Sequence, residues 1–279
     1  MIITNFRVHS HHGKYDYIYA HNDEDPDVPW SFLNDVKYVD AWLPLPDYFE
    51  VTKMSKEEAL TKLNSLYKNS NKKAVMFAIH GWNTSPFEHF VNMKKANENT
   101  DYLFIPILWN TDRGYSTELD YKYDRVVTAP RAATQLANLE SFFSRVEQKK
   151  GWLCHSMGCY VTQFFASELD SNHPVRAANL FDLFFMVAPD LRYDIFNEYP
   201  FKAGEGKNEC DPDSWNNPDP DKRTPDCRVG GGQALVKLAK GGVHDINKLR
   251  VYWNKNDYSG DIRPMRLSIE IFQKWPLSP

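Results

Sequence analysis

The sequence predicts an α/β protein with a mostly parallel central sheet flanked by helices. Short, continuously apolar runs recur along the chain, as is typical of strands that are covered on both faces. Helical patterns separate these runs, and alternating strands and helices favour parallel pairing. The chain has 279 residues, which is enough for one domain with a large core. We therefore expect a single domain over residues 1–279, with a loop-rich insertion at about 191–246.

The first 50 residues predict antiparallel strands at one edge of the sheet. Strand-like segments at 2–8 and 15–19 are separated by turn clusters. His9, His11 and His12 lie close together in this region. Because their spacing is not that of regular metal ligands, exposed edge histidines are the favoured interpretation and no metal is expected.

The alternation of helices and strands starts at a capping box, Ser55-Lys-Glu-Glu58, which predicts a helix that ends near Asn69. A long helical pattern at 120–148 contains Pro130, which should kink it or start a new helix. Apolar runs predict strands at 74–79, 102–109, 151–155, 181–189 and 249–254.

One short motif, Cys154-His155-Ser156-Met157-Gly158, lies between a predicted strand and an amphipathic helix. A serine on such a tight turn is lifted above the sheet by strained backbone torsions, which require small residues two positions to either side. Gly158 meets that requirement and Cys154 meets it approximately. The N-terminus of the helix favours a negative charge that develops near the serine. This geometry suits an acyl-transfer enzyme.

Three ordered motifs resemble the α/β-hydrolase superfamily, and within it the lipase-like bacterial group whose members mostly lack an assigned substrate. The serine lies in HSMG at 155–158. HGWN at 80–83 is similar to the oxyanion loop of the family. The segment 252–257 resembles the strand end that carries the triad acid. Together the motifs extend over roughly two-thirds of the chain and are more specific than any one of them.

The resemblance implies the α/β-hydrolase fold and a serine hydrolase of carboxylic esters or lipids that works through an acyl-enzyme intermediate, without a metal or organic cofactor. Ser156 would be the nucleophile, and the N–H groups of Met157 and Trp82 would receive the oxyanion. The triad acid would be Asp257, or alternatively Asp190, which also follows a predicted strand. The residues expected to shape the motifs are His80, Gly81 and Gly158.

The catalytic histidine is not identifiable from the sequence. In this fold it comes last in chain order, yet no histidine follows His244, which precedes the last predicted strand and so lies on the order of 20 Å from the catalytic edge. His80 belongs to the oxyanion loop, and the side chain of His155 should point away from the serine hydroxyl.

The C-terminal segment 267–275 is predicted to be a helix, so the last strand of the fold is expected to be absent. The simplest hypothesis is a chain shortened at its C-terminus that has lost both the last strand and the histidine. Two alternatives are open: recruitment of another histidine, or a non-catalytic binding protein of the same fold. An exposed sheet edge would then favour self-association.

Composition excludes other classes of function. The chain has 33 Lys and Arg against 37 Asp and Glu, which argues against nucleic acid as a partner. The partner that the resemblance implies is a small-molecule ester or lipid substrate. No run is long enough to span a membrane, and the N-terminus lacks the pattern of a signal peptide. Four cysteines do not make a disulfide framework in a chain of this length, so a cytoplasmic location is expected.

Two of these cysteines, Cys210 and Cys227, bracket an acidic, proline-rich stretch of the insertion. A solvated loop is the favoured interpretation, ahead of a disulfide-closed loop. A calcium site ranks third, because Trp215 occupies a ligand position of an EF-hand pattern.

Overall fold

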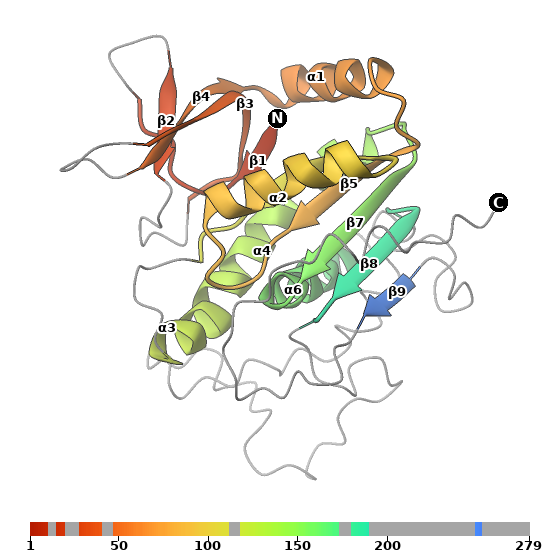
Figure 1. The fold of residues 1–279 in the computed structure, drawn as a ribbon. Coiled ribbons are helices and arrows are strands. Elements are labelled where there is room, and N and C mark those ends of the chain that lie inside the picture. Colours follow the sequence, from red (N-terminus) through yellow and green to blue (C-terminus); the bar gives the residue numbers. More distant parts are fainter. Residues whose placement is uncertain are drawn as a thin grey trace.

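A computed structural model of the chain shows an α/β protein whose central sheet is mixed and has nine described strands. The strands lie in the order β2-β4-β3-β1-β6-β5-β7-β8-β9 (Figure 1). The structure describes residues 1–10, 15–19, 28–40, 47–111, 118–172, 180–189 and 249–252. This architecture confirms the predicted fold class.

The parallel half of the sheet follows the predicted apolar runs closely. All six residues of the central strand β5 are buried, because helices cover both of its faces. β5 pairs in parallel with β6 and β7, β7 with β8, and β8 with β9. The bounds of these strands are β5 Ala74–Ile79, β6 Tyr102–Leu108, β7 Lys150–His155, β8 Leu183–Val187 and β9 Leu249–Tyr252.

The other half is antiparallel, as predicted for the first 50 residues. β3 pairs with β1 and with β4, and β4 pairs with β2. The strand β1 joins the halves, since its other edge pairs in parallel with β6. The strands are β1 Ile2–Thr4, β2 Asp16–Tyr19, β3 Ser31–Val39 and β4 Tyr48–Met54, of which β3 and β4 were not predicted.

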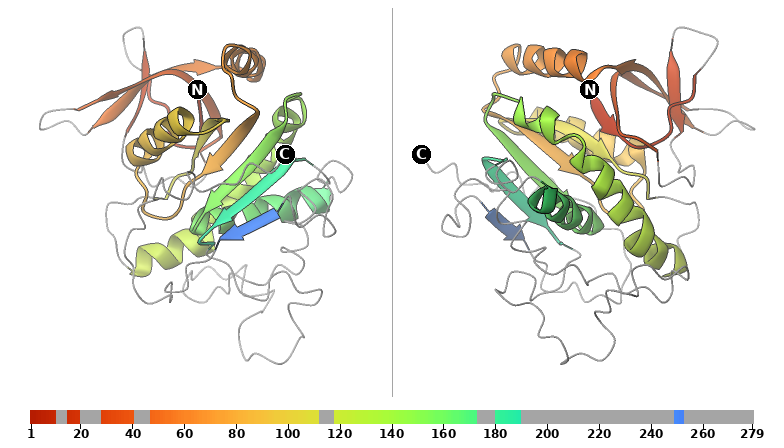
Figure 2. Two further views of the ribbon diagram at one scale, coloured as in Figure 1. Left: turned by 45° about the vertical axis from the view of Figure 1, so that its right-hand side comes forward. Right: turned by 180° about the vertical axis from the view of Figure 1, so that it is seen from behind.

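Helices pack on both faces of the parallel half (Figures 1 and 2). Val75, Phe77 and Ile79 share a cluster with residues of α1, α4 and α6. Met76 and Ala78, which alternate with them along β5, contact α2 through a second cluster. The main helices are α1 Lys56–Lys68, α2 Pro86–Asn99, α4 Ala129–Ala137 and α6 Met157–Asn172.

The long helical pattern at 120–148 is divided into several elements. It forms α3 Glu118–Tyr123, a π-helical turn η1 Asp124–Thr128, α4 and then α5 Glu140–Ser144. Pro130 occupies the first turn of α4, where proline is tolerated because that N–H has no helical acceptor. α4 thus begins one residue before the proline and follows η1 directly, which is the second of the two predicted outcomes, a kink or a new helix.

The predicted insertion at 191–246 and the C-terminal segment after Tyr252 lie outside the described residues. The predictions of an absent last strand and of an exposed edge that favours self-association fall on those residues too. The predictions for the loop between Cys210 and Cys227 likewise lie outside the described part.

Candidate active site

Backbone strain gathers where the parallel strands end. Among the described residues, four that are not glycine have positive φ: Asn83 at 53°, Ser156 at 48°, Ala188 at 41° and Asp35 at 51°. The first three follow β5, β7 and β8 at one edge of the sheet, whereas Asp35 lies at an irregularity of β3. Left-handed backbone at ordinary residues costs energy and clusters at functional sites. The carboxyl edge is therefore the candidate site.

Ser156 is the turn residue between β7 and α6. Its N–H donates to the carbonyl of Val187 on β8 at 3.0 Å, and its carbonyl accepts from the N–H of Cys159 at 2.9 Å. The sheet and the first turn of α6 therefore hold the strained conformation together. This is the predicted strand-to-helix turn, with the serine at the N-terminus of a 16-residue helix. We call the turn at 155–158 the elbow.

Two glycines let the loop after β5 approach this turn. A Cβ on Gly158 would lie 2.3 Å from the carbonyl oxygen of His80, which is a backbone atom. A Cβ on Gly81 would lie 2.9 Å from both Ser156 Cβ and His155 Nδ1. Real Cβ atoms do not approach other atoms so closely, so glycine at both positions allows the 80–83 loop to lie against the elbow.

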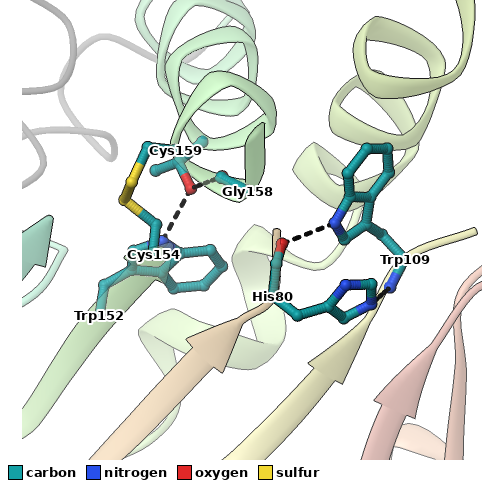
Figure 3. Close-up of a disulfide and its surroundings, with 7 residues drawn as sticks. His80, Trp109, Trp152, Cys154, Gly158 and Cys159 are labelled. Atoms are coloured by element: carbon teal, nitrogen blue, oxygen red, sulfur yellow. Dashed lines mark hydrogen bonds between the residues drawn. A yellow bond between two sulfur atoms is a disulfide. The ribbon is translucent and has the colours of Figure 1, made fainter. Parts of the chain in front are cut away.

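His80 is held in place by three hydrogen bonds and is almost fully buried. Its Nε2 accepts the backbone N–H of Trp109 at 3.1 Å, which leaves Nδ1 to donate to the carbonyl of Gly81 at 2.8 Å. The indole of Trp109 donates to the carbonyl of His80 at 2.8 Å (Figure 3). Because both ring nitrogens are occupied, His80 holds the loop and is not placed to accept a proton from Ser156.

Burial keeps three histidines near this edge neutral. Desolvation lowers the pKa of His80 well below its usual value, and the neighbouring His89 lowers it further. Desolvation also lowers the pKa of His89 and that of His155 to about 4. His89 Nε2 donates to the carbonyl of Ala78 at 2.9 Å. The His155 ring is turned toward Gly81, so it lies beside the 80–83 loop.

Met157 and Trp82 are the predicted oxyanion donors. Met157 is the first residue of α6, so its N–H has no acceptor within the helix. Trp82 is partly buried in the 80–83 loop, and its indole donates to Asp124 at 3.0 Å. The two residues belong to the two segments that Gly81 brings into contact. Their N–H groups therefore come from the two places that an oxyanion hole of this fold uses.

A disulfide between Cys154 and Cys159 flanks the serine (Figure 3). It links the end of β7 to the first turn of α6, and both cysteines are fully buried. The prediction that the cysteines make no disulfide framework was therefore wrong for this pair. The tight elbow sets the two Cα atoms 4.8 Å apart, within the range of a disulfide, and a count of cysteines carries no such information.

Both candidates for the triad acid, Asp257 and Asp190, lie outside the described residues, so their predicted roles remain predictions. His244 falls there too. β9 pairs in parallel with β8 and sets Tyr252 opposite Val187, so the chain leaves β9 at the edge that carries Ser156. Within the described part of the chain, no cluster of three metal-ligating side chains occurs. No helix among the described residues is long and apolar enough to cross a membrane.

Asp124 was not predicted from the sequence; the fold brings it beside the site through its bond to Trp82, 42 residues away in the chain. No local pattern around Asp124 pointed to it.

One family model matches the chain. It is described as an alpha/beta hydrolase of unknown function (DUF900) and aligns with residues 55–211, more than half of the sequence. The match includes both the 80–83 loop and the elbow. No curated protein and no solved structure matches significantly.

Proposed function

The chain belongs to this family of alpha/beta hydrolases of unknown function, and we propose that it is a serine hydrolase of carboxylic esters or lipids with Ser156 as nucleophile. The observation that carries the proposal is the left-handed backbone of Ser156, with φ at 48° between β7 and the N-terminus of α6. A fold of this kind can hold a serine there without chemistry. The adjacent 80–83 loop, which supplies a second N–H, is what favours acyl transfer.

In the proposed reaction, Ser156 Oγ attacks the carbonyl carbon of the ester and transfers its proton to a base. The carbonyl oxygen becomes an oxyanion that accepts from the N–H groups of Met157 and Trp82. The C–O bond to the alcohol then breaks, and the alcohol leaves with the proton from the base. Water attacks the acyl-enzyme, gives its proton to the base and releases the carboxylic acid, which restores the serine hydroxyl.

The base is the open part of this mechanism. His80 is unsuited because both of its ring nitrogens are hydrogen-bonded. His155 and His244 are the remaining candidates among the histidines considered, and we propose Asp257 as the orienting acid, with Asp190 as the alternative. The resemblance of 252–257 to the strand end that carries the triad acid favours Asp257, whereas Asp190 follows β8 by three residues.

An apolar acyl group suits the surroundings of Trp82. Its ring meets that of Tyr121 edge to face, with the ring centroids 5.3 Å apart. Trp109 does not belong to this surface, because it is fully buried in the core and its indole donates to the carbonyl of His80.

A fluorophosphonate probe tests the proposal, because it forms a covalent bond only with an activated serine. We expect labelling of the wild-type chain at Ser156, located by peptide mass spectrometry, and loss of both labelling and ester turnover in Ser156→Ala. Ser167→Ala, on the same helix, is the matched control and should retain both. Labelling at another residue, or none in a folded sample, would contradict the proposal and favour a binding protein of this fold.

A further inference from the structure

Asp124 is a fully buried carboxylate to which three described side chains donate. Its Oδ2 accepts from the indole of Trp82 at 3.0 Å and from the hydroxyl of Thr111 at 3.3 Å. Its Oδ1 accepts from Thr128 at 2.8 Å. A carboxylate is costly to bury unless hydrogen bonds replace its water, so this residue requires a specific set of donors.

Those donors come from three separate segments. Trp82 lies in the loop after β5, Thr111 follows β6, and Thr128 closes the π-helical turn η1 that Asp124 opens. Asp124 thereby ties the 80–83 loop to the neighbouring strand end and to the helical layer. Single π-helical turns are rare and are frequently found at functional sites.

The next residue of the same turn reaches the elbow helix. The guanidinium of Arg125 lies over the ring of Tyr160 on α6, 4.4 Å from its centroid, and Nη1 donates to the hydroxyl of Tyr121 at 3.3 Å. Tyr121 in turn packs on the Trp82 ring. The η1 turn therefore contacts both the 80–83 loop and the helix that begins just after Ser156.

We propose that Asp124 is a positioning residue of the site, which fixes the Trp82 indole and through it the backbone N–H that receives the oxyanion. This inference rests on the proposed serine-hydrolase function. An oxyanion donor is effective only if it is held in place before the charge develops. The loop needs such support, because Trp82 is only partly buried and the adjacent Asn83 has a φ of 53°.

The test compares kcat and KM for ester hydrolysis in Trp82→Phe, Asp124→Ala and Asp124→Asn. Trp82→Phe keeps the aromatic contact with Tyr121 and removes the indole donor. We expect kcat to fall about tenfold in Trp82→Phe and in Asp124→Ala, with KM within about twofold, because an oxyanion donor acts on the transition state. Asp124→Asn retains an acceptor oxygen and should recover most of kcat.

Trp30→Phe is the matched control. The Trp30 indole is also partly buried and also donates one hydrogen bond of 3.0 Å, to the carbonyl of Ala132 on α4. Its kcat should stay near that of the wild type. The double variant of Trp82→Phe and Asp124→Ala should lose no more kcat than the stronger single variant, because each single variant already removes the hydrogen bond between Trp82 and Asp124.

Several outcomes would overturn the positioning role. They are a wild-type kcat in Trp82→Phe, a loss confined to KM, or multiplicative losses in the double variant. If Asp124→Ala does not fold, Asp124→Asn and Trp82→Phe still decide the question. Failure of the underlying function is separately visible, because the wild-type chain would then show neither turnover nor fluorophosphonate labelling at Ser156.

Discussion

The two halves of the sheet differ both in burial and in what their strand ends carry: every residue of β5 is buried, whereas β3 and β4 combine buried with partly or fully exposed residues. In the parallel half, strained backbone and neutral buried histidines gather at the carboxyl ends of β5, β7 and β8. In the antiparallel half, the one strained residue described, Asp35, lies at an irregularity in the middle of β3. Parallel strands end together at one edge, so their loops can build one site. Antiparallel strands send alternate ends to opposite edges.

The seam between the halves is polar. Thr4 at the end of β1 donates to the carbonyl of Leu108 at 3.0 Å, and Asn5 Oδ1 accepts the N–H of Asn110 at 2.9 Å. Thr4, the last residue of β1, and Asn5, which follows it, are both buried and lie beside the end of β6, directly before Trp109. The antiparallel half therefore supports the edge of the site without supplying strained residues to it.

The largest effect we expect comes from Gly158→Ala. The new Cβ would clash with backbone atoms, the carbonyl oxygens of His80 at 2.3 Å and Ile79 at 3.0 Å, which cannot move without displacing β5. We expect a loss of at least about 3 kcal/mol in the free energy of unfolding, measured by denaturant titration. Activity should fall with it, because the 80–83 loop would be pushed from the elbow.

Gly151→Ala is the control for that substitution. Its Cβ would meet mainly the end of the Met76 side chain, with Cε at 2.7 Å, and a terminal methyl group can rotate away. A loss of about 1 kcal/mol is expected. Equal losses of unfolding free energy in the two variants would show that a clash with backbone atoms at the elbow costs no more than a clash with a movable side chain.

Much of the parallel half could be predicted because burial on both faces leaves a local signature. The strand β5 matches its predicted range of 74–79, since every one of its residues is apolar and buried. β3 and β4 escaped prediction because charged residues such as Asp35 and Lys37 interrupt their apolar pattern. Their pairing is decided by partners elsewhere in the chain.

The same distinction holds in the site. The turn at Ser156 depends on adjacent residues, so the motif was sufficient to place it. Asp124 and the Cys154–Cys159 disulfide depend on tertiary packing, which no local pattern records. The two candidates for the triad acid belong to parts of the chain outside the described residues, so for them the sequence-based expectations remain predictions.

The second prediction concerns acid stability and His89. Its pKa is lowered to about 4 by burial, so between pH 6.5 and 4 the unfolded chain binds a proton that the folded chain does not. Stability should therefore fall as the pH drops through this window, by about 3 kcal/mol at pH 4 for this residue. His89→Gln keeps an N–H for the carbonyl of Ala78 and does not titrate.

We expect a shallower loss of stability for His89→Gln than for the wild type, measured by thermal or urea unfolding at pH 7, 5.5 and 4. Comparison at pH 7 separates the cost of repacking from the titration effect. An unchanged slope of stability against pH would show that His89 does not contribute to the acid sensitivity of the parallel half.

The third prediction concerns α1, the helix that connects the antiparallel half to the parallel half along the chain. α1 follows β4 and leads into β5, and Ser55 caps it by accepting from the N–H of Glu58 while the Glu58 carboxylate accepts from Ser55. Ser55→Ala should reduce the free energy of unfolding by about 1 kcal/mol. Ser85 caps α2 through one bond only, from the N–H of Glu88, so Ser85→Ala should cost less. A larger loss of unfolding free energy in Ser85→Ala than in Ser55→Ala would show that the capping box does not stabilise its helix more than the single cap bond does.

The smallest effects compare backbone strain in the two halves. Ser156→Gly should be more stable than Ser156→Ala by about 1 kcal/mol, and Asp35→Gly more stable than Asp35→Ala by a similar amount, because only glycine is relaxed at positive φ.

Relative to the wild type, however, only Ser156→Gly should gain stability, by a few tenths of a kcal/mol. Asp35 tolerates the left-handed region better than serine, and its carboxylate accepts from Thr52 at 3.4 Å. Urea unfolding of the four variants decides this: a gain at Asp35 and none at Ser156 would mean that the strain at the carboxyl edge is no greater than that of an ordinary bulge.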